Sequence, residues 1–156
     1  MPKFHTYETV VTWTGNQGGG TSDYKTYSRS HEICGKNKPA IPGSSDPAFR
    51  GDPERYNPEE LLVASLASCH MLWYLHLAAV NSVVVVDYHD ESVGFMEEEE
   101  DGGGKFKKVT LRPVVSITRD SDLETALSLH QSAHRKCFIA NSVSFTVGVE
   151  PTIQRA

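Results

Sequence analysis

The 156-residue sequence is poor in positive charge and in cysteine. Fifteen Lys and Arg residues stand against twenty Asp and Glu residues, which gives a net charge of −5 and a pI near 5.8. The basic residues are scattered, so no basic stripe is present to neutralise a phosphate backbone. These features exclude the usual type of nucleic-acid-binding protein.

Cysteine occurs only three times, as Cys34, Cys69 and Cys137. An odd and small number of cysteines is not typical of a secreted disulfide framework. The first residues, MPKFHTYETVV, lack the basic stretch and apolar run of a signal peptide, so we expect a cytoplasmic, reducing setting. In that setting, two thiols brought together are more often catalytic or metal-binding than structural.

The overall composition, 38% hydrophobic and 22% charged, is that of an ordinary soluble protein. The length fits one compact domain. We find no internal repeat and no linker, and we expect a single domain over residues 1–156.

The strongest local signal is the start of a helix at Asn57. Asn57 is a good N-cap, Pro58 suits the first helical position, and Glu59 and Glu60 fall in the first turn. Residues 61–80 then form a run of twenty residues without a charged side chain, and this run is as long as a membrane span. Two histidines, two serines and one cysteine interrupt that run, and no basic anchor precedes it. We therefore expect a buried helix at the centre of a soluble protein, not a membrane segment.

The remaining elements follow from periodicity and turn signals. The capping box Ser121-x-x-Glu124 predicts a second helix that ends at Lys136, directly before Cys137. The order ββ-α-ββ-α-β indicates an α+β fold in which antiparallel sheets pack on two central helices. Strands are expected at residues 4–14, 24–33, 82–96, 105–118 and 143–149, with a long proline-rich connection over residues 34–56.

Cys69 and Cys137 both fall on helical stripes. On the first helix, Cys69 shares a face with Leu62, Ser65, Leu66 and Leu72, within an apolar surface broad enough to be covered on nearly all sides. On the second helix, one stripe contains Leu123, Ala126, Leu127, His130, His134 and Cys137.

A purely structural role for these cysteines and histidines is considered first. A lone cysteine on an apolar helix is usually an inert, small hydrophobic residue, and this interpretation is kept for Cys34. His130 and His134 are interpreted as polar members at the edge of the stripe. Because Cys69 is followed by His70 and Cys137 follows His134, a joint redox or metal-binding role for the two cysteines remains open.

The motif NPEELLVASLASCHM, together with a second cysteine after a helix in AHRKCFIANS, resembles the OsmC/Ohr family of thiol-dependent peroxidases. The resemblance covers nearly the whole chain in element order. It implies that Cys69 attacks the peroxide and that Cys137 resolves the product as an intramolecular disulfide. It further implies an organic hydroperoxide as substrate, a dithiol as reductant and no cofactor.

The resemblance also implies that a glutamate at the helix start and an arginine before it hold the reactive thiolate. Glu59 matches the glutamate. For the arginine, Arg50 is the first choice, Arg55 the second and Arg29 the third. A nearby cation would stabilise the thiolate over the thiol. The alternative is that Glu59 is only a first-turn carboxylate and Arg50 a solvated loop charge.

Helix geometry limits how Glu59 can act on Cys69. The two residues are ten positions apart, which corresponds to about 15 Å of helix rise, so they cannot meet within one straight helix. A second copy of the helix, packed antiparallel over the small residues at positions 64–68, would bring them together. The other solution is a loop arginine that bridges the gap within one chain. We expect a homodimer with sites at or near its interface.

Two features depart from the family pattern. Phe138 follows Cys137 where many members have proline, so the presentation of Cys137 is expected to differ. The long connection over residues 34–56 and the acidic, glycine-rich loop EEEEDGGG differ from the shorter members.

Two other functions remain open at this point. One is a zinc-binding protein that uses Cys69, His70, His134 and Cys137, which are residue types that suit zinc. Against it, Cys69 and His70 are adjacent on a helix and point about 100° apart, so both cannot easily bind one ion. A small-molecule-binding protein without peroxidase turnover is the other possibility.

Overall fold

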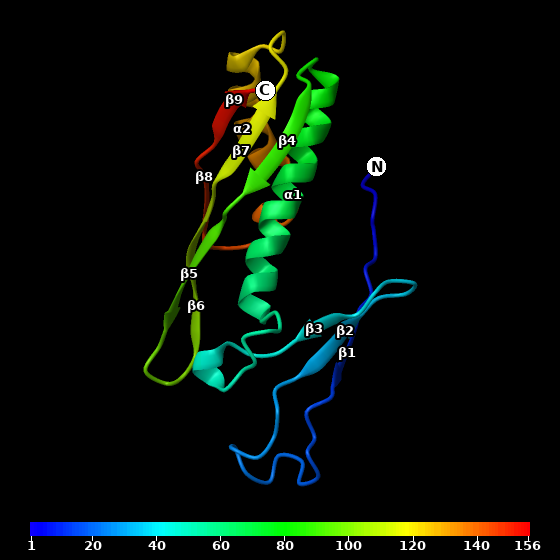
Figure 1. Cartoon of the computed structure of the whole chain (residues 1–156), viewed down its shortest axis with the longest axis vertical. Coiled ribbons are helices and arrows are strands. Elements are labelled where there is room, and N and C mark those ends of the chain that lie inside the picture. Colours follow the sequence, from blue (N-terminus) through cyan, green and yellow to red (C-terminus); the bar gives the residue numbers. More distant parts are fainter. The chain divides into compact units, whose positions relative to one another are not determined.

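A computed structural model describes all residues from Met1 to Ala156. The chain forms two compact units, Met1–Leu61 and Leu62–Ala156, which are described in turn (Figure 1). The expectation of one domain over the whole chain stays a prediction.

The first unit is built on a three-stranded antiparallel sheet in the order β1-β2-β3. The predicted hairpin between the first two strands is confirmed, but β1 (Val10–Trp13) and β2 (His31–Cys34) are shorter than expected. The strand β3 (Ile41–Gly43) was not predicted, because it lies in the proline-rich connection. A Cβ at Gly43 would lie 2.3 Å from Nε2 of His31 on the paired strand, so a larger residue there would displace the His31 ring.

The first unit ends in the opening turn of α1 (Pro58–Val80), as the sequence predicts. The Asn57 side chain accepts a hydrogen bond from the Glu60 backbone N–H at 2.8 Å, and the Glu60 carboxylate accepts one from the Asn57 N–H at 3.3 Å. This reciprocal arrangement satisfies two donors at the helix start. It uses Glu60 and leaves the carboxylate of Glu59 available for other contacts.

The second unit contains two further three-stranded sheets, in the orders β4-β7-β9 and β5-β6-β8. The sequence predicts one long strand on each side of the acidic turn, whereas the structure divides each of them into two. Figure 1 shows the resulting two-stranded ribbon, whose pieces pass from one sheet to the other. The strands are β4 (Val85–Asp90), β5 (Val93–Glu98), β6 (Gly104–Leu111) and β7 (Pro113–Ile117).

The C-terminal strands complete these sheets by parallel pairing, which the expectation of purely antiparallel sheets missed. The strand β8 (Thr146–Val149) pairs with β6, and β9 (Thr152–Arg155) pairs with β7. Pro151 separates the two strands, because proline has no N–H to donate to a ladder. The fold is therefore α+β as predicted, with mixed sheets.

The second helix, α2, runs from Leu123 to Lys136. Its N-cap is Asp122, not Ser121 as the capping box predicted: the Asp122 carboxylate accepts a hydrogen bond from the Thr125 N–H at 2.8 Å. The Ser121 hydroxyl instead accepts one from the Val84 N–H at 2.9 Å, and so ties the helix entry to the segment before β4. Asp122 is the better cap because a carboxylate also complements the positive end of the helix.

The buried stripes of the two helices differ from those expected. On α1 the buried residues are Leu66, His70, Tyr74 and Ala78, and on α2 they are Ala126, Leu129, His130 and Ala133. Two leucines assigned to the stripe of α2, Leu123 and Leu127, are exposed. His130 lies within the core and not at its edge.

One face of α1 remains open in the single chain. By length and composition α1 could cross a membrane, but the core helices of soluble proteins meet the same criteria. Only 22% of its most apolar stretch of 18 residues is buried. Leu72 is 62% exposed on the open face. The expectation that this helix is covered on nearly all sides is therefore not met by one chain alone.

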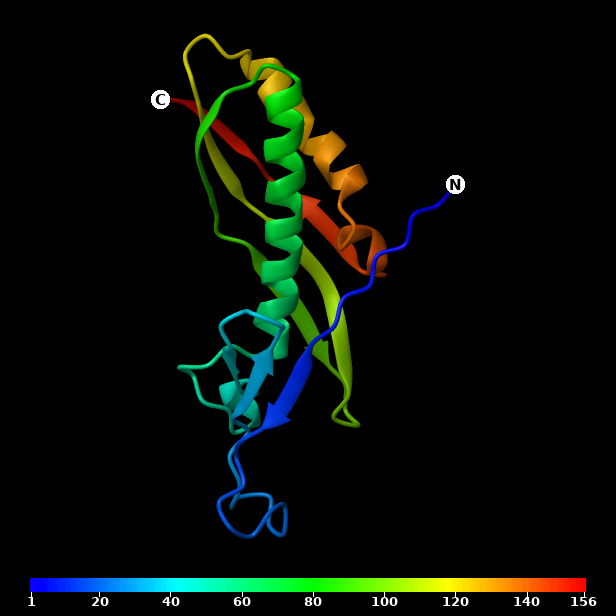
Figure 2. The same ribbon diagram turned by 90° about the vertical axis from the view of Figure 1, so that its right-hand side faces the viewer.

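The helices α1 and α2 lie side by side (Figure 2), and two histidines form a polar contact between them. His70 and His130 are buried, and Nε2 of His70 lies 3.0 Å from Nδ1 of His130. The His130 ring stacks on Tyr74 with 3.9 Å between centroids, and the Tyr74 hydroxyl donates to the Ala126 carbonyl at 2.8 Å. Burial lowers the pKa of His70 to about 4 and that of His130 to about 3, so both imidazoles are neutral at pH 7.

The histidine pair predicts acid sensitivity. The folded pKa of each imidazole lies below its unfolded value, so the unfolded state binds more protons and stability falls as the pH drops from about 6.5 towards about 4. The slope can reach about 1.4 kcal/mol per pH unit for each imidazole. Urea unfolding between pH 7 and pH 5 measures this. The double variant His70→Gln/His130→Asn keeps one donor and one acceptor without a titrating ring, so its pH dependence should be flatter; an equal slope would contradict the assignment.

Candidate functional site

The two cysteines that the sequence singles out lie side by side in the second unit. Cys69 lies near the middle of α1 and is half-buried, whereas Cys137 is the C-cap of α2 and is only 1% exposed. Both are free thiols, close enough together for Cys69 to affect the ionisation of Cys137. The Cys137 sulfur also accepts a hydrogen bond from the Ala140 N–H at 3.5 Å.

The surroundings of Cys137 keep it protonated. Burial, together with the adjacent Cys69 thiol, raises the pKa of Cys137 to about 11, and the hydrogen bond from the Ala140 N–H opposes this only in part. At pH 7 the Cys137 side chain is therefore a thiol and a weak nucleophile. Such a group suits a second step, in which it reacts with an already oxidised neighbour.

Aromatic side chains flank the thiol pair. Trp73, one helical turn beyond Cys69, packs edge-on against Phe138 with 5.5 Å between centroids. The Lys136 ammonium lies 5.5 Å from the centroid of the Trp73 ring. Phe138 itself is 68% exposed. The residue that departs from the family's proline thus contributes an exposed aromatic surface beside Cys137.

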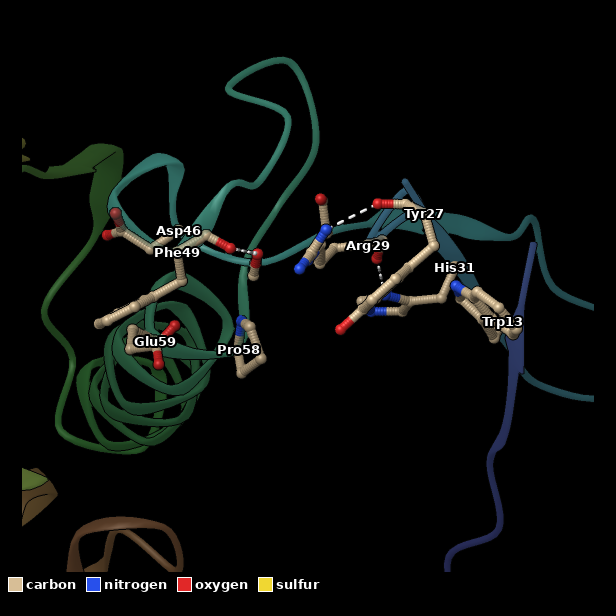
Figure 3. A pocket seen from close by; sticks show the side chains of 10 residues that line it. Trp13, Tyr27, Arg29, His31, Asp46, Phe49, Pro58 and Glu59 are labelled. Atoms are coloured by element: carbon tan, nitrogen blue, oxygen red, sulfur yellow. Dashed lines mark hydrogen bonds between the residues drawn. The ribbon is translucent and has the colours of Figure 1, made fainter. Parts of the chain in front are cut away.

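The first unit contains a pocket of about 310 Å³ at the start of α1 (Figure 3). In Figure 3, Pro58, Glu59 and Phe49 lie on one side of the pocket, Tyr27 and Trp13 on the other, and Arg29 between them. Most of the lining is apolar, and its charged groups are Arg29, Asp46 and Glu59. The remaining lining residues are His31, Ser44 and Ser45.

The Arg29 side chain is held rigidly. Its guanidinium donates to the carbonyls of Tyr27 and Tyr24, at 2.6 and 2.7 Å. The same guanidinium lies over both tyrosine rings, 3.9 Å from the centroid of Tyr27 and 4.6 Å from that of Tyr24. Such contacts fix a cation in one orientation without neutralising it.

The other two candidate arginines lie elsewhere in the first unit. Arg50 is exposed, with a positive φ of 65°, at the C-cap of a short 3₁₀ helix (Pro47–Phe49). Arg55 forms an ion pair with Glu32 at 3.1 Å and donates to the His31 carbonyl at 3.1 Å, so it holds β2 in place. Neither arginine lines the pocket that contains Glu59. The structure therefore brings Glu59 together with Arg29, the third choice from the sequence.

Two features of these sites escape the sequence. The pocket lined by Arg29 and Glu59 is formed by β1, the loop before β2 and the start of α1, and no local sequence motif indicates that these segments come together. The His70–His130 pair is also invisible, although the adjacent letters Cys69-His70 were a partial signal. The zinc alternative gains no support, since no three His, Cys, Asp or Glu side chains are arranged to hold a metal ion.

Comparisons with known proteins agree with this fold. The chain matches the family of OsmC-like proteins over residues 51–152. A search among curated proteins finds no match. An OsmC-like protein of unknown function from Vibrio cholerae is 33% identical, with a TM-score of 0.84 over 95% of this chain and 99% of that one.

Two organic hydroperoxide resistance proteins share the fold at lower identity. The protein from Elizabethkingia anophelis is 18% identical with a TM-score of 0.70, and all of both chains is covered. The protein from Bacillus subtilis is 24% identical with a TM-score of 0.58, over 95% of this chain and 98% of that one. The family match over most of the chain and the similarity to the Vibrio protein lead to one conclusion: this chain belongs to the OsmC/Ohr family.

Proposed function

We propose that this protein is a thiol-dependent peroxidase that reduces organic hydroperoxides. The observation that carries the proposal is the pair of neighbouring free thiols, one half-buried on α1 and one buried at the end of α2. Two solved relatives of the same fold are named organic hydroperoxide resistance proteins. The aromatic side chains beside the thiols favour a peroxide with an apolar tail.

In the proposed cycle, the Cys69 thiolate attacks the outer oxygen of the hydroperoxide. The O–O bond breaks, the alkoxide takes up a proton and leaves as an alcohol, and Cys69 becomes a sulfenic acid. The Cys137 sulfur then attacks the Cys69 sulfur and displaces hydroxide, which leaves as water with the proton of the Cys137 thiol. A cytoplasmic dithiol reduces the resulting disulfide and becomes a disulfide itself.

Single substitutions separate the two thiol roles. Cys69→Ser should abolish consumption of cumene hydroperoxide, because the attacking sulfur is lost. Cys137→Ser should consume about one equivalent and then stall as a sulfenic acid that dimedone traps. Mass spectrometry of the intact protein and of its peptides distinguishes these states. Cys34→Ser is the matched control and should turn over like the wild type. Equal residual turnover in the first two variants would contradict the proposed roles.

We further propose that Arg29, with Glu59, supports the Cys69 thiolate, and that Arg50 does not. Arg29 is a preorganised cation in an apolar pocket, where its field is screened less than that of the exposed Arg50. Because Glu59 and Cys69 are separated by about 15 Å of helix rise, we propose that the pocket of one copy serves the thiol of a second copy.

The arginine assignment is tested by comparing two variants. Arg29→Ala should slow sulfenic acid formation by about 10- to 100-fold, since the thiolate loses its cation. Arg50→Ala, which removes the same charge from an exposed position, should stay within about threefold of wild type. Stopped-flow kinetics with cumene hydroperoxide measures both. The reverse order of effects would return the role to Arg50.

The homodimer is proposed from the open face of α1. Ala64, Ser68 and Leu72 are exposed there at helical spacings of four, and residues 61–80 contain no Lys, Arg, Asp or Glu. A stripe of this kind is stable in water only when another surface covers it, and the small residues allow close approach of a second helix.

Light scattering at micromolar concentration tests the dimer directly. Wild type should scatter as a dimer, and Leu72→Arg should shift it towards monomer because a charge would be buried in the contact. Glu100→Arg, in the exposed acidic turn, is the control and should remain dimeric. A wild-type monomer at these concentrations would contradict the proposal.

A further inference from the structure

The contact between α1 and α2 is held by two polar links that lie close to the thiol pair. His70 Nε2 meets His130 Nδ1 at 3.0 Å, and the Tyr74 hydroxyl meets the Ala126 carbonyl at 2.8 Å. Higher numbers on α1 pair with lower numbers on α2, so the helices are antiparallel. His70 directly follows Cys69, whereas Tyr74 lies more than one helical turn further along α1, so the histidine link is the nearer of the two to the thiols.

The single hydrogen bond of the histidine pair does not offset the free-energy cost of burying two imidazole rings. One hydrogen bond joins the two rings, while Nδ1 of His70 and Nε2 of His130 have no partner although both atoms are buried. A single neutral hydrogen bond stabilises by about 1 kcal/mol, and an unpaired buried polar atom costs about 1–3 kcal/mol. Apolar side chains of the same size would pack at least as well. A buried polar pair of this type is best explained by the specificity that it adds.

The specificity concerns helix register. Apolar surfaces such as Leu66 and Ala133 tolerate sliding, because dispersion contacts are not directional. A hydrogen bond between two buried rings is directional and is lost when one helix shifts by one residue, which is about 1.5 Å of rise and 100° of rotation. A disulfide is equally demanding, since it needs Cα atoms about 4.4–6.8 Å apart.

We propose that the His70–His130 pair is a positioning element, which holds α1 and α2 in the register that lets Cys137 reach Cys69. This inference rests on the proposed peroxidase function for its role in turnover. The step concerned is the attack of the Cys137 thiol on the Cys69 sulfenic acid, which forms the S–S bond and releases water. The histidines themselves do not contact the reacting atoms; they act through the two helices.

The variant His130→Phe tests this inference, since it keeps a ring to stack on Tyr74 but removes the nitrogen that meets His70. We expect sulfenic acid formation within about threefold of wild type and disulfide closure slower by about tenfold or more, as an effect confined to the second step. His130→Asn, which places an amide oxygen near the position of Nδ1, should recover most of the closure rate. Rapid quench with dimedone, followed by mass spectrometry, reports both steps.

A reduction potential gives a second readout that does not need peroxide. The Cys69–Cys137 disulfide is formed with diamide and equilibrated in a dithiothreitol buffer. If the effective concentration of Cys137 at Cys69 falls about tenfold in His130→Phe, the potential becomes less negative by about 30 mV. This measurement is informative even if the wild type proves inactive towards peroxides, in which case the peroxidase function fails and the register role is still tested.

Two controls separate positioning from general loosening of the core. Tyr74→Phe removes the other polar link between the same helices and should leave closure rate and potential within about twofold of wild type. His70→Phe should reproduce the effect of His130→Phe, and the double variant should be no worse than either single, as expected for one shared interaction.

Three results would overturn the inference. Wild-type closure rate and potential in His130→Phe would show that the pair does not position the thiols. An equal loss in Tyr74→Phe would assign the effect to core stability. Additive losses in the double variant would show that the two histidines act separately. Thermal unfolding of each variant establishes that the folded state is compared, and His70→Phe replaces His130→Phe if the latter does not fold.

Discussion

The structure depends on how α1 is covered. This helix of 23 residues has almost no charge beyond its first turn, and it must therefore be shielded from water on more than one side. The second unit covers the stripe from Leu66 to Ala78 with α2 and the sheets. The opposite stripe, around Leu72, is exposed in the single chain. One helix thus supplies the core of the second unit, the position of Cys69 and the surface on which we propose association.

The sequence could predict the parts of this fold that are encoded locally. The start of α1 at Pro58 follows from a cap, a proline and two acidic residues within four positions, and the structure places it there. The α+β class and the pairing of the first two strands follow from periodicity and from a glycine-rich turn. Parallel pairing of β8 and β9 could not be predicted, because it joins segments distant in the sequence through α2. The N-cap of α2 was placed at Ser121 instead of Asp122 for a similar reason. The Ser121 hydroxyl accepts a hydrogen bond from the N–H of Val84, a residue distant in the sequence.

Some residues of the candidate site could also be predicted from the sequence, and others could not. Cys69 and Cys137 were found because cysteine is rare in this chain and both lie on helical stripes, and the structure places their side chains together. The arginine was harder to choose, because Arg50, Arg55 and Arg29 all precede α1 and no local motif distinguishes them. Arg29 is the most distant of the three from α1 in sequence, and its contacts with Tyr24 and Tyr27 hold it in the lining of the pocket that also contains Glu59. His130 was assigned to the edge of a stripe because histidine is usually solvated, whereas His70, the partner ring that permits its burial, lies on another helix.

The parallel pairing of the C-terminal strands has a consequence for the newly made chain. β8 and β9 can join their sheets only after α2 has been synthesised, so the second unit is incomplete until the last strand has left the ribosome. Cys69 emerges long before Cys137 and has no thiol partner during that interval. An oxidant that reaches Cys69 at this stage can carry it past the sulfenic acid to irreversible forms. The disulfide step that we propose for the mature protein is therefore not available to the unfinished chain.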